Sequence, residues 1–418
     1  MTSTAMTPKA RVGLGRRLQL WAIARARRSR FLPVGIPDKL ADEHRLGMGF
    51  NQPIMLFFAT VQDSLYQLRP WYPALSTLTE THPVVAVFKD SRTARIVRAE
   101  TAFDCVTIAK YGQLDAILAK SEVKLALYVN HDPLNFEALR FTSMTHVYIG
   151  HGDSDKGVSV SNQIKAYDFC FVAGQGAVDR TSNQIMLYDG PARCVIIGQP
   201  QLDADQRDLL PPVDPQGRPT VLYAPTWEGA QPSVSYGSVE SHGVALARAL
   251  VDCGAYRVIY RPHPLSGVHN GGFAAADAKI RAIVKAAPGH RIDTANSLPE
   301  SFADADLLIC DVSAVSLNWL PSGKPLIVTK PTVAASNLAE SRLMETVPLL
   351  ERDADVVSLV RTQLDDDRSK DARGALIDYY LSDPTPGVAT GKFVDACTRV
   401  METRDREWAA LHARGAVG

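Results

Sequence analysis

Residues 307–329 read LLICDVSAVSLNWLPSGKPLIVT, and this stretch decides the fold of the chain. The apolar run 307–310 predicts a buried strand, and Ser313 is a suitable N-cap for the amphipathic helix that follows. Gly323 ends that helix ahead of a second apolar run at 326–329. Strand, helix and strand in this order predict a right-handed βαβ unit with a parallel sheet. The helix is either a capped structural element or one wall of an anion site, because its first N–H groups are free.

Short apolar runs and helical stretches alternate along the rest of the chain. The stretch 65–78 is expected to be helical despite Pro70 and Pro73. A second series begins at 221–223, after a polar, proline-rich stretch at 203–220 that we interpret as a linker. The alternation predicts an α/β fold of two Rossmann-like domains, whose parallel sheets face a central cleft at their carboxyl edges. This layout is common to dehydrogenases, epimerases and transferases, so it does not select a reaction.

The length of 418 residues exceeds what one ordinary core supports, which also favours two domains. The expected parts are an N-terminal segment at 1–35, a first domain at 36–205, a second domain at 206–385 and a C-terminal helix at 386–418.

The overall composition excludes several classes of protein. Lys plus Arg and Asp plus Glu number 45 each, so no net charge favours nucleic acid as a partner. The six cysteines are scattered without a CxxC pair, which indicates reduced thiols in a cytosolic protein. No apolar run approaches the roughly 18–20 residues that a membrane span requires. We also find no cleavable signal peptide.

The N-terminal segment is strongly basic. Residues 9–30 include eight basic residues, and no acidic residue precedes Asp38. Leu14, Leu18 and Trp21 follow helical spacing, so a helix here would carry an apolar stripe between arginines. This pattern is typical of a helix that lies on an anionic membrane surface. The alternatives are a disordered basic tail and a helix that packs on its own domain.

Two clusters of candidate site residues come from the first and second domains. His151 stands between Gly150 and Gly152 at the end of an apolar run, where a ligand can approach the backbone closely. The alternatives are a hydrogen-bonded turn histidine and, for the nearby Lys156, a solvated surface charge. Thr226 and Trp227 follow the strand at 221–223 in a loop stiffened by a proline. Their hydroxyl and ring suit a substrate or simple packing equally well.

Two further clusters belong to the second domain. Arg261 and His263 alternate with prolines after the strand at 257–260, and a guanidinium beside an imidazole suits phosphate oxygens. A structural pair between Arg261 and a carboxylate is the competing interpretation. Asp311 and Ser313 open the helix of the deciding stretch. No HExxH, nucleophile elbow or P-loop motif is present, so we expect no metal site and no covalent intermediate.

Together these clusters resemble the CDP-glycerol glycerophosphotransferase family, the teichoic-acid polymerases and primases of bacterial cell walls. The resemblance covers residues 146–329. It rests on four elements in the order of the family: His-Gly-x-x-x-Lys from His151 to Lys156, Tyr-Ala-Pro-Thr-Trp at 223–227, Arg-Pro-His-Pro at 261–264, and Asp-x-Ser at 311–313 with the later Lys324-Pro325. The chain departs from the family at 153–155, where Asp-Ser-Asp replaces Thr-Pro-Leu, and at Asn318, where an Asp is usual.

The resemblance implies a GT-B type fold, with an acceptor domain first and a nucleotide-donor domain second. It implies transfer of glycerol phosphate, or a similar phosphoalcohol, from CDP-glycerol to a hydroxyl of a cell-wall or capsule glycan or glycolipid, with release of CMP. No cofactor is expected. It also implies peripheral attachment to the inner face of the cell membrane, which the basic N-terminus suits.

His151, as general base, and His263 are the expected catalytic residues. The expected substrate-binding residues are Gly152, Lys156, Thr226, Trp227, Arg261, Asp311 and Ser313. Two alternative functions are a GT-B glycosyltransferase that uses a UDP- or CMP-sugar, and a non-catalytic, membrane-associated nucleotide-binding scaffold.

Overall fold

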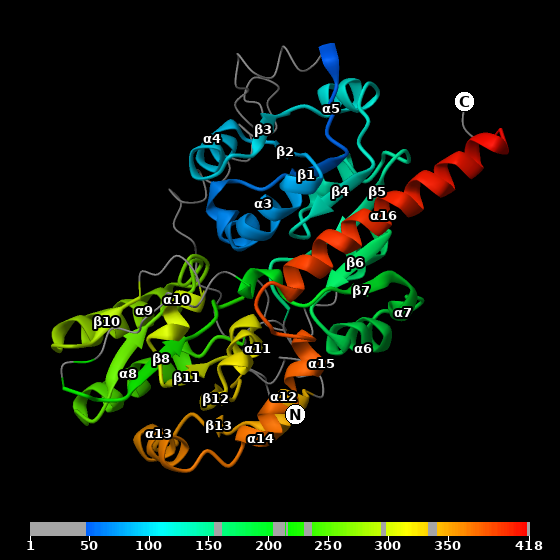
Figure 1. Ribbon diagram of the computed structural model, residues 1–418. Helices are drawn as coiled ribbons and strands as arrows, with labels where there is room; N and C mark the ends of the chain where they lie inside the picture. The colour runs from blue at the N-terminus through cyan, green and yellow to red at the C-terminus, as the bar shows by residue number, and fades with distance from the viewer. Residues whose placement is uncertain are drawn as a thin grey trace, which may run out of the picture.

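The protein folds into two α/β domains that lie side by side (Figure 1). The computed structural model describes residues 47–153, 161–203, 214, 216–229, 236–293, 298–332 and 341–415. The predicted N-terminal segment at 1–35 and most of the predicted linker lie outside these residues. In the described part of the chain, no helix is both long enough and apolar enough to cross a membrane.

The first domain contains a sheet of seven parallel strands in the order β3-β2-β1-β4-β5-β6-β7. Its strands are β1 (Ile54–Phe58), β2 (Val84–Phe88), β3 (Asp104–Thr107), β4 (Leu125–Tyr128), β5 (Thr145–Tyr148), β6 (Phe169–Val172) and β7 (Cys194–Ile196). Its α-helices are α3 (Tyr72–Thr81), α4 (Ser91–Glu100), α5 (Tyr111–Leu118), α6 (Gln175–Gln184) and α7 (Gly190–Arg193). Its 3₁₀ turns are η1 (Gln62–Gln67), η2 (Arg69–Trp71), η3 (Pro133–Glu137), η5 (Asn162–Ala166) and η6 (Pro200–Leu202).

The central strand β1 is buried along its whole length because helices cover both faces of the sheet. Ile54 and Phe58 pack with α3 and α4, whereas Met55 and Phe57 pack with α5 on the opposite face. The strand order reverses between β1 and β4, and open α/β sheets bind ligands beyond the carboxyl ends of the strands at such a point.

The helix expected at 65–78 is shorter than predicted. Two 3₁₀ turns, η1 and η2, occupy its first half, and α3 begins only at Tyr72. The prolines explain this difference, since a proline lacks the N–H that a helix interior needs and is tolerated in the first turn. Pro70 accordingly lies in the first turn of η2 and Pro73 in the first turn of α3.

The second domain contains a sheet of six parallel strands in the order β10-β9-β8-β11-β12-β13. Its strands are β8 (Thr220–Ala224), β9 (Arg257–Tyr260), β10 (Arg291–Ile292), β11 (Leu307–Cys310), β12 (Leu326–Thr329) and β13 (Leu349–Leu350). Its helices and turns are η8 (Val239–Gly243), α8 (Val244–Asp252), α9 (Gly271–Ala286), α10 (Leu298–Ala303), α11 (Ala314–Trp319), η9 (Leu320–Ser322), α12 (Arg342–Thr346), α13 (Val356–Asp365) and α14 (Lys370–Gly374).

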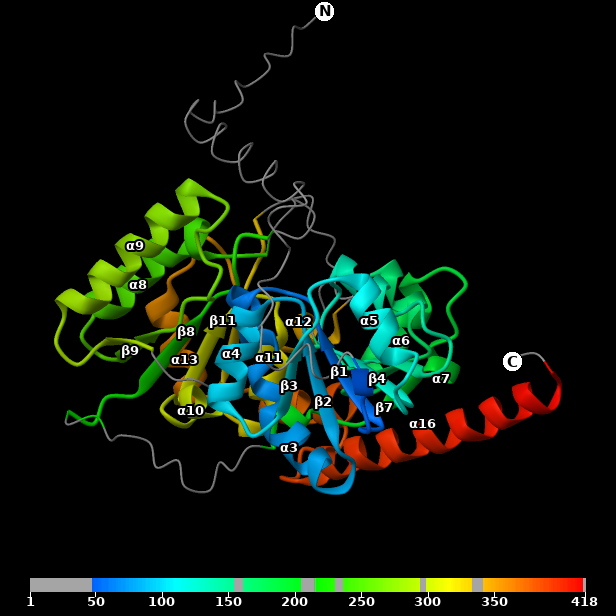
Figure 2. The ribbon, with the colours of Figure 1, turned by 90° about the horizontal axis from the view of Figure 1, so that it is seen from above.

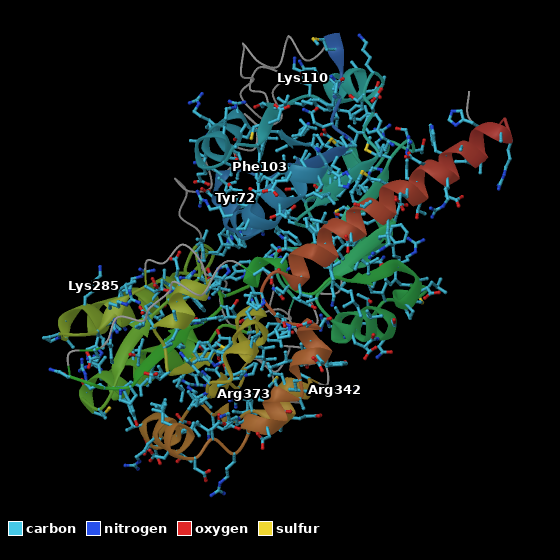
Figure 3. The ribbon with its side chains drawn as sticks, viewed as in Figure 1. Tyr72, Phe103, Lys110, Lys285, Arg342 and Arg373 are labelled. Carbon is cyan, nitrogen blue, oxygen red and sulfur yellow. The ribbon has the colours of Figure 1, made fainter. Side chains whose placement is uncertain are left out.

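The deciding stretch forms the predicted βαβ unit. β11 pairs in parallel with β12 and with β8, and α11 connects β11 to β12. Gly323 ends the helical segment in the left-handed conformation, with φ of 66°. Its carbonyl oxygen accepts a hydrogen bond from Arg373, a fully buried side chain that also pairs with Asp367. Arg373 lies on α14, where Figure 3 labels it. The turn is therefore held by a part of the chain 50 residues away.

The last two helices connect the domains. α15 (Ile377–Leu381) packs on α6, and α16 (Val388–Ala413) runs along the first domain (Figure 1, Figure 2). Phe393 of α16 lies fully buried against Trp71, with ring centroids 5.2 Å apart. A side chain at Gly174 would come within 2.5 Å of the Tyr379 carbonyl oxygen, so only glycine allows the close approach of α15. Because α15 also contacts α11 of the second domain, the end of the chain packs on both domains.

Candidate active site

A cavity of about 380 Å³ lies between the carboxyl edges of the two sheets. It is bounded by loops that follow β5, β8 and β9 and by the start of α11. The predicted site residues that line it are His151, Gly152, Thr226, Trp227, His263 and Ser313. Residues from all four sequence clusters therefore meet at one cavity. Lys156 lies outside the described residues, and Arg261 and Asp311 do not line the cavity.

His151 is exposed at the end of a loop that the first domain fixes in place. The indole nitrogen of the buried Trp71 donates a 2.6 Å hydrogen bond to the carbonyl oxygen of Gly150. The imidazole Nδ1 of His151 lies 3.3 Å from the carbonyl oxygen of Val129. Because a carbonyl oxygen only accepts, Nδ1 carries the hydrogen, and in the neutral ring Nε2 is the basic nitrogen. This arrangement suits a general base.

In His263 the hydrogen of the neutral ring lies on the other nitrogen than in His151. Its Nδ1 accepts a 3.1 Å hydrogen bond from the backbone N–H of Leu265, so in the neutral ring Nε2 carries the hydrogen. The ring stacks on Trp227, with centroids 6.3 Å apart and an interplanar angle of 23°. Both of these residues line the cavity. His263 therefore offers a hydrogen-bond donor where His151 offers an acceptor.

The first-domain loop and the start of α11 touch at the cavity. A Cβ atom added at Gly152 would lie 3.1 Å from the Cβ of Ala314, so glycine permits the close approach. Ser313 occupies the N-cap position of α11, but its side chain makes no capping hydrogen bond. Its Oγ is buried and has no hydrogen-bond partner among the described residues. Ser313 is one of the residues that border the cavity.

Asp311 acts on the site indirectly. Its carboxylate is fully buried and accepts the backbone N–H groups of Thr226 at 2.7 Å and Ser238 at 3.1 Å. The hydroxyl of Thr329 donates to its other oxygen. Burial raises the pKa of Asp311, with these hydrogen bonds opposing the shift. The residue thus ties the loop after β8, which carries Thr226, to the ends of β11 and β12.

Arg261 makes the carboxylate pair that the sequence analysis named as the alternative to phosphate binding. Its Nη1 donates to the buried carboxylate of Asp293 at 2.6 Å and to the hydroxyl of Ser301 at 2.7 Å. The Arg261 side chain is 22% exposed, and the residue is not among those that line the cavity. The structure therefore gives Arg261 a structural partner, and its role in phosphate binding stays a prediction.

Two departures from the family motifs also have positions in the structure. Asp153 lines the cavity and forms an ion pair with Arg180, whose side chain is 7% exposed. Asn318 is buried on α11, and it is not among the residues that border the cavity. Of the departures that fall within the described residues, Asp153 is the one that borders the cavity.

Sequence reasoning missed Tyr66 and His131, which both line the cavity. His131 follows β4 and stacks on Tyr148, with ring centroids 4.1 Å apart. Burial, with a smaller contribution from His151, lowers the pKa of His131 to about 4, so the ring is neutral at pH 7. Its position directly after a strand could have indicated a site residue, whereas nothing local distinguishes Tyr66.

Among the described residues, no group of three or more His, Cys, Asp or Glu side chains could hold a metal ion. The polar groups that border the cavity are imidazoles, hydroxyls and backbone groups, together with the side chains of Asp153, Arg180, Gln199 and Gln201. Such groups can accept a proton from a hydroxyl and can donate hydrogen bonds to phosphate oxygens.

Comparison with known proteins defines the fold class. No protein-family model and no curated protein sequence matches the chain. The solved structure of the wall teichoic acid polymerase TagF is similar, with a TM-score of 0.58 at 15% identity, over 93% of this chain and 97% of that chain. The structure of Staphylococcus aureus MnaA with UDP has a TM-score of 0.56 at 13% identity, over 84% of this chain and 97% of that chain. A glycosyltransferase from Rickettsia africae has a TM-score of 0.52 at 12% identity, over 84% of this chain and 99% of that chain.

At these identities the likeness establishes the fold. The protein has a GT-B fold of two Rossmann-like domains, each with a parallel sheet. The fold class predicted from the sequence is confirmed.

Proposed function

We propose that the protein is a transferase that moves glycerol phosphate, or a similar phosphoalcohol, from CDP-glycerol to a hydroxyl of a cell-wall or capsule glycan or glycolipid. The observation that carries this proposal is the complementary pair of histidines at one interdomain cavity. The Nε2 of His151 can accept a proton, and the Nε2 of His263 can donate a hydrogen bond. No cofactor takes part, since CDP-glycerol is itself the donor substrate.

In the proposed reaction, His151 removes the proton from the acceptor hydroxyl. The acceptor oxygen attacks the phosphorus that carries the glycerol, and the bond from this phosphorus to the oxygen of CMP breaks. CMP leaves with the bridging oxygen, on which His263 stabilises the developing charge by donating a hydrogen bond. The proton ends on His151. A positioned general base of this kind contributes roughly 10²–10⁴-fold to the rate.

The second domain supplies groups for the donor. Trp227 extends the stacked surface beside His263, and Asp311 holds the Thr226 backbone in place. Ser313 borders the same cavity. The solved structures support a nucleotide-activated donor, because a TagF variant was soaked with CDPG and MnaA was solved with UDP.

A GT-B glycosyltransferase that uses a UDP- or CMP-sugar is the second candidate. It is favoured by the ion pair between Asp153 and Arg180, which changes the cavity at a position where the family motif has no carboxylate. The likeness to the Rickettsia glycosyltransferase also agrees with it. A non-catalytic scaffold at the membrane would keep the cavity and lack turnover.

A donor screen separates the three functions. The full chain is incubated with a membrane extract as acceptor and with CDP-glycerol, UDP-sugars or a CMP-sugar, and the released nucleotide and the labelled group on the acceptor are identified. The proposal expects CMP from CDP-glycerol, together with glycerol phosphate on the acceptor. Release of UDP from a UDP-sugar, or of CMP from the CMP-sugar alone, would establish the glycosyltransferase. Binding of a donor without any release would establish the scaffold.

A further inference from the structure

Tyr66 lies beside both histidines of the cavity. It belongs to η1, the turn that follows β1 at the point where the strand order of the first sheet reverses. Its ring packs edge-on against His151, with centroids 6.2 Å apart, and against His263 of the other domain, with centroids 5.5 Å apart. Tyr66 and both histidines line the same cavity, so a group bound between the two imidazoles lies beside this residue.

A partly buried hydrogen-bond network shows that the Tyr66 hydroxyl accepts from Gln67 rather than donating to it. Asn130 is 6% exposed, and its amide nitrogen donates to Thr60 Oγ1 at 3.0 Å and to Gln67 Oε1 at 2.7 Å. Because the Gln67 oxygen accepts from Asn130, its amide nitrogen is the group that faces Tyr66. This nitrogen donates to the phenolic oxygen at 3.2 Å. The Tyr66 oxygen is thus an acceptor in this bond, and its own hydrogen remains available to the cavity.

We infer that Tyr66 is a further catalytic residue, whose hydroxyl donates a hydrogen bond to a non-bridging oxygen of the phosphoryl group during transfer. The inference rests on the proposed function, because the phosphoryl group would lie between the acceptor oxygen held by His151 and the leaving oxygen held by His263. Tyr66 keeps its proton throughout, so the proton and electron balance of the reaction is unchanged.

The electrostatic state of Tyr66 suits this role. Burial raises the pKa of the phenol, and the bond from Gln67 opposes the shift only in part. The phenol therefore stays neutral at pH 7 and does not repel a phosphate. Catalysis of phosphoryl transfer depends mainly on positioning and on stabilising charge at the phosphoryl oxygens. A fixed, neutral donor at this place stabilises the transition state without having to reorient.

A purely structural role for Tyr66 predicts different behaviour, because phenylalanine keeps the ring contacts with both histidines. Tyr66→Phe should lower kcat for CMP release by about 100-fold, the usual effect of removing one oxyanion donor. The KM for CDP-glycerol should stay within about threefold, since the lost bond forms mainly in the transition state. Tyr72→Phe is the matched control, because the Tyr72 hydroxyl bonds to the exposed Glu100 away from the cavity.

Gln67 provides a second and sharper test. In Gln67→Glu, both carboxylate oxygens accept, so the one that faces Tyr66 should capture the phenolic hydrogen. This variant should lose nearly as much kcat as Tyr66→Phe although the tyrosine is still present. Gln67→Met removes the bond without capturing the hydrogen and should lose much less.

The wild type, the two tyrosine variants and the two Gln67 variants are assayed together with CDP-glycerol and membrane acceptor, and circular dichroism checks that each is folded. If the wild type and Tyr66→Phe release CMP at similar rates, the role of Tyr66 is refuted while the proposed function stands. Equal loss in both tyrosine variants, or equal rates in Gln67→Glu and Gln67→Met, would also refute it. If the wild type releases no CMP, the proposed function fails, and the role of Tyr66 fails with it.

Discussion

The buried carboxylate of Asp311 offers a quantitative test of how the site is held together. Asp311→Ala removes the acceptor of two buried backbone N–H groups, those of Thr226 and Ser238. Each buried donor left without a partner costs about 1–3 kcal/mol, so the variant should lose about 2–6 kcal/mol of unfolding free energy. Asp311→Asn should lose far less at pH 7. Its carbonyl oxygen can accept both N–H groups, and its amide can donate to the Thr329 hydroxyl.

The pKa of Asp311 predicts how the difference in stability between Asp311→Asn and the wild type changes with pH. Burial raises the pKa of Asp311 in the folded protein above its usual value near 3.8. The folded state therefore binds the proton more tightly than the unfolded state, and the contribution of this group to stability falls as the pH rises from the unfolded pKa through the folded pKa. Relative to the wild type, Asp311→Asn should be more stable at pH 7 than at pH 3.5.

Urea unfolding followed by circular dichroism measures both effects. An alanine variant within about 0.5 kcal/mol of the wild type would refute the proposed network, since surface changes commonly stay within that range. A loss in Asp311→Asn as large as in Asp311→Ala would show that the negative charge, rather than the hydrogen bonding, is what the fold requires.

Three further predictions concern other parts of the chain. Arg261→Ala removes the counter-charge of the buried Asp293, so urea titrations should show an unfolding free energy lower by about 3–5 kcal/mol. Weaker CDP binding in calorimetry with an unchanged unfolding free energy would instead favour direct phosphate binding by Arg261. Burial lowers the pKa of His131 from 6.5 to about 4. As the pH falls from 7 to 4, the unfolding free energy of the wild type should therefore decrease by about 3 kcal/mol more than that of His131→Gln. Equal decreases in the two proteins would contradict the burial of His131 as a neutral ring. The full chain should sediment with vesicles that contain anionic lipid, because each basic residue near the surface contributes about 1 kcal/mol of binding free energy. Binding that persists after the basic residues at 9–30 are replaced by neutral ones would refute membrane attachment through this segment.

The sequence predicts the fold well because each βαβ unit is encoded locally. Apolar runs such as Leu307–Cys310 become fully buried strands, and a glycine in the left-handed conformation ends the connecting helical segment. The positions of the clusters after strands also place His151 and His263 at one cavity, since parallel strands bring their carboxyl ends to a common edge.

The contacts that decide the roles of individual residues are not local. Arg261 meets Asp293 through a separation of 32 residues, and Asp311 reaches Thr226 across 85 residues. Tyr66 lies at the cavity because 3₁₀ turns replace the expected helix after β1, and its contact with His263 requires both domains. No periodicity in a single sequence reports such contacts, so residue roles could be predicted less well than the layers of the fold.

In the proposed reaction, His151 removes the proton of the acceptor hydroxyl as CMP is released. The most direct test compares the wild type with His151→Ala, measuring CMP release from CDP-glycerol and, by calorimetry, CDP-glycerol binding. The variant should be at least about 10²-fold slower and should bind the donor within about threefold of the wild-type affinity. Unchanged turnover in His151→Ala would contradict the claim.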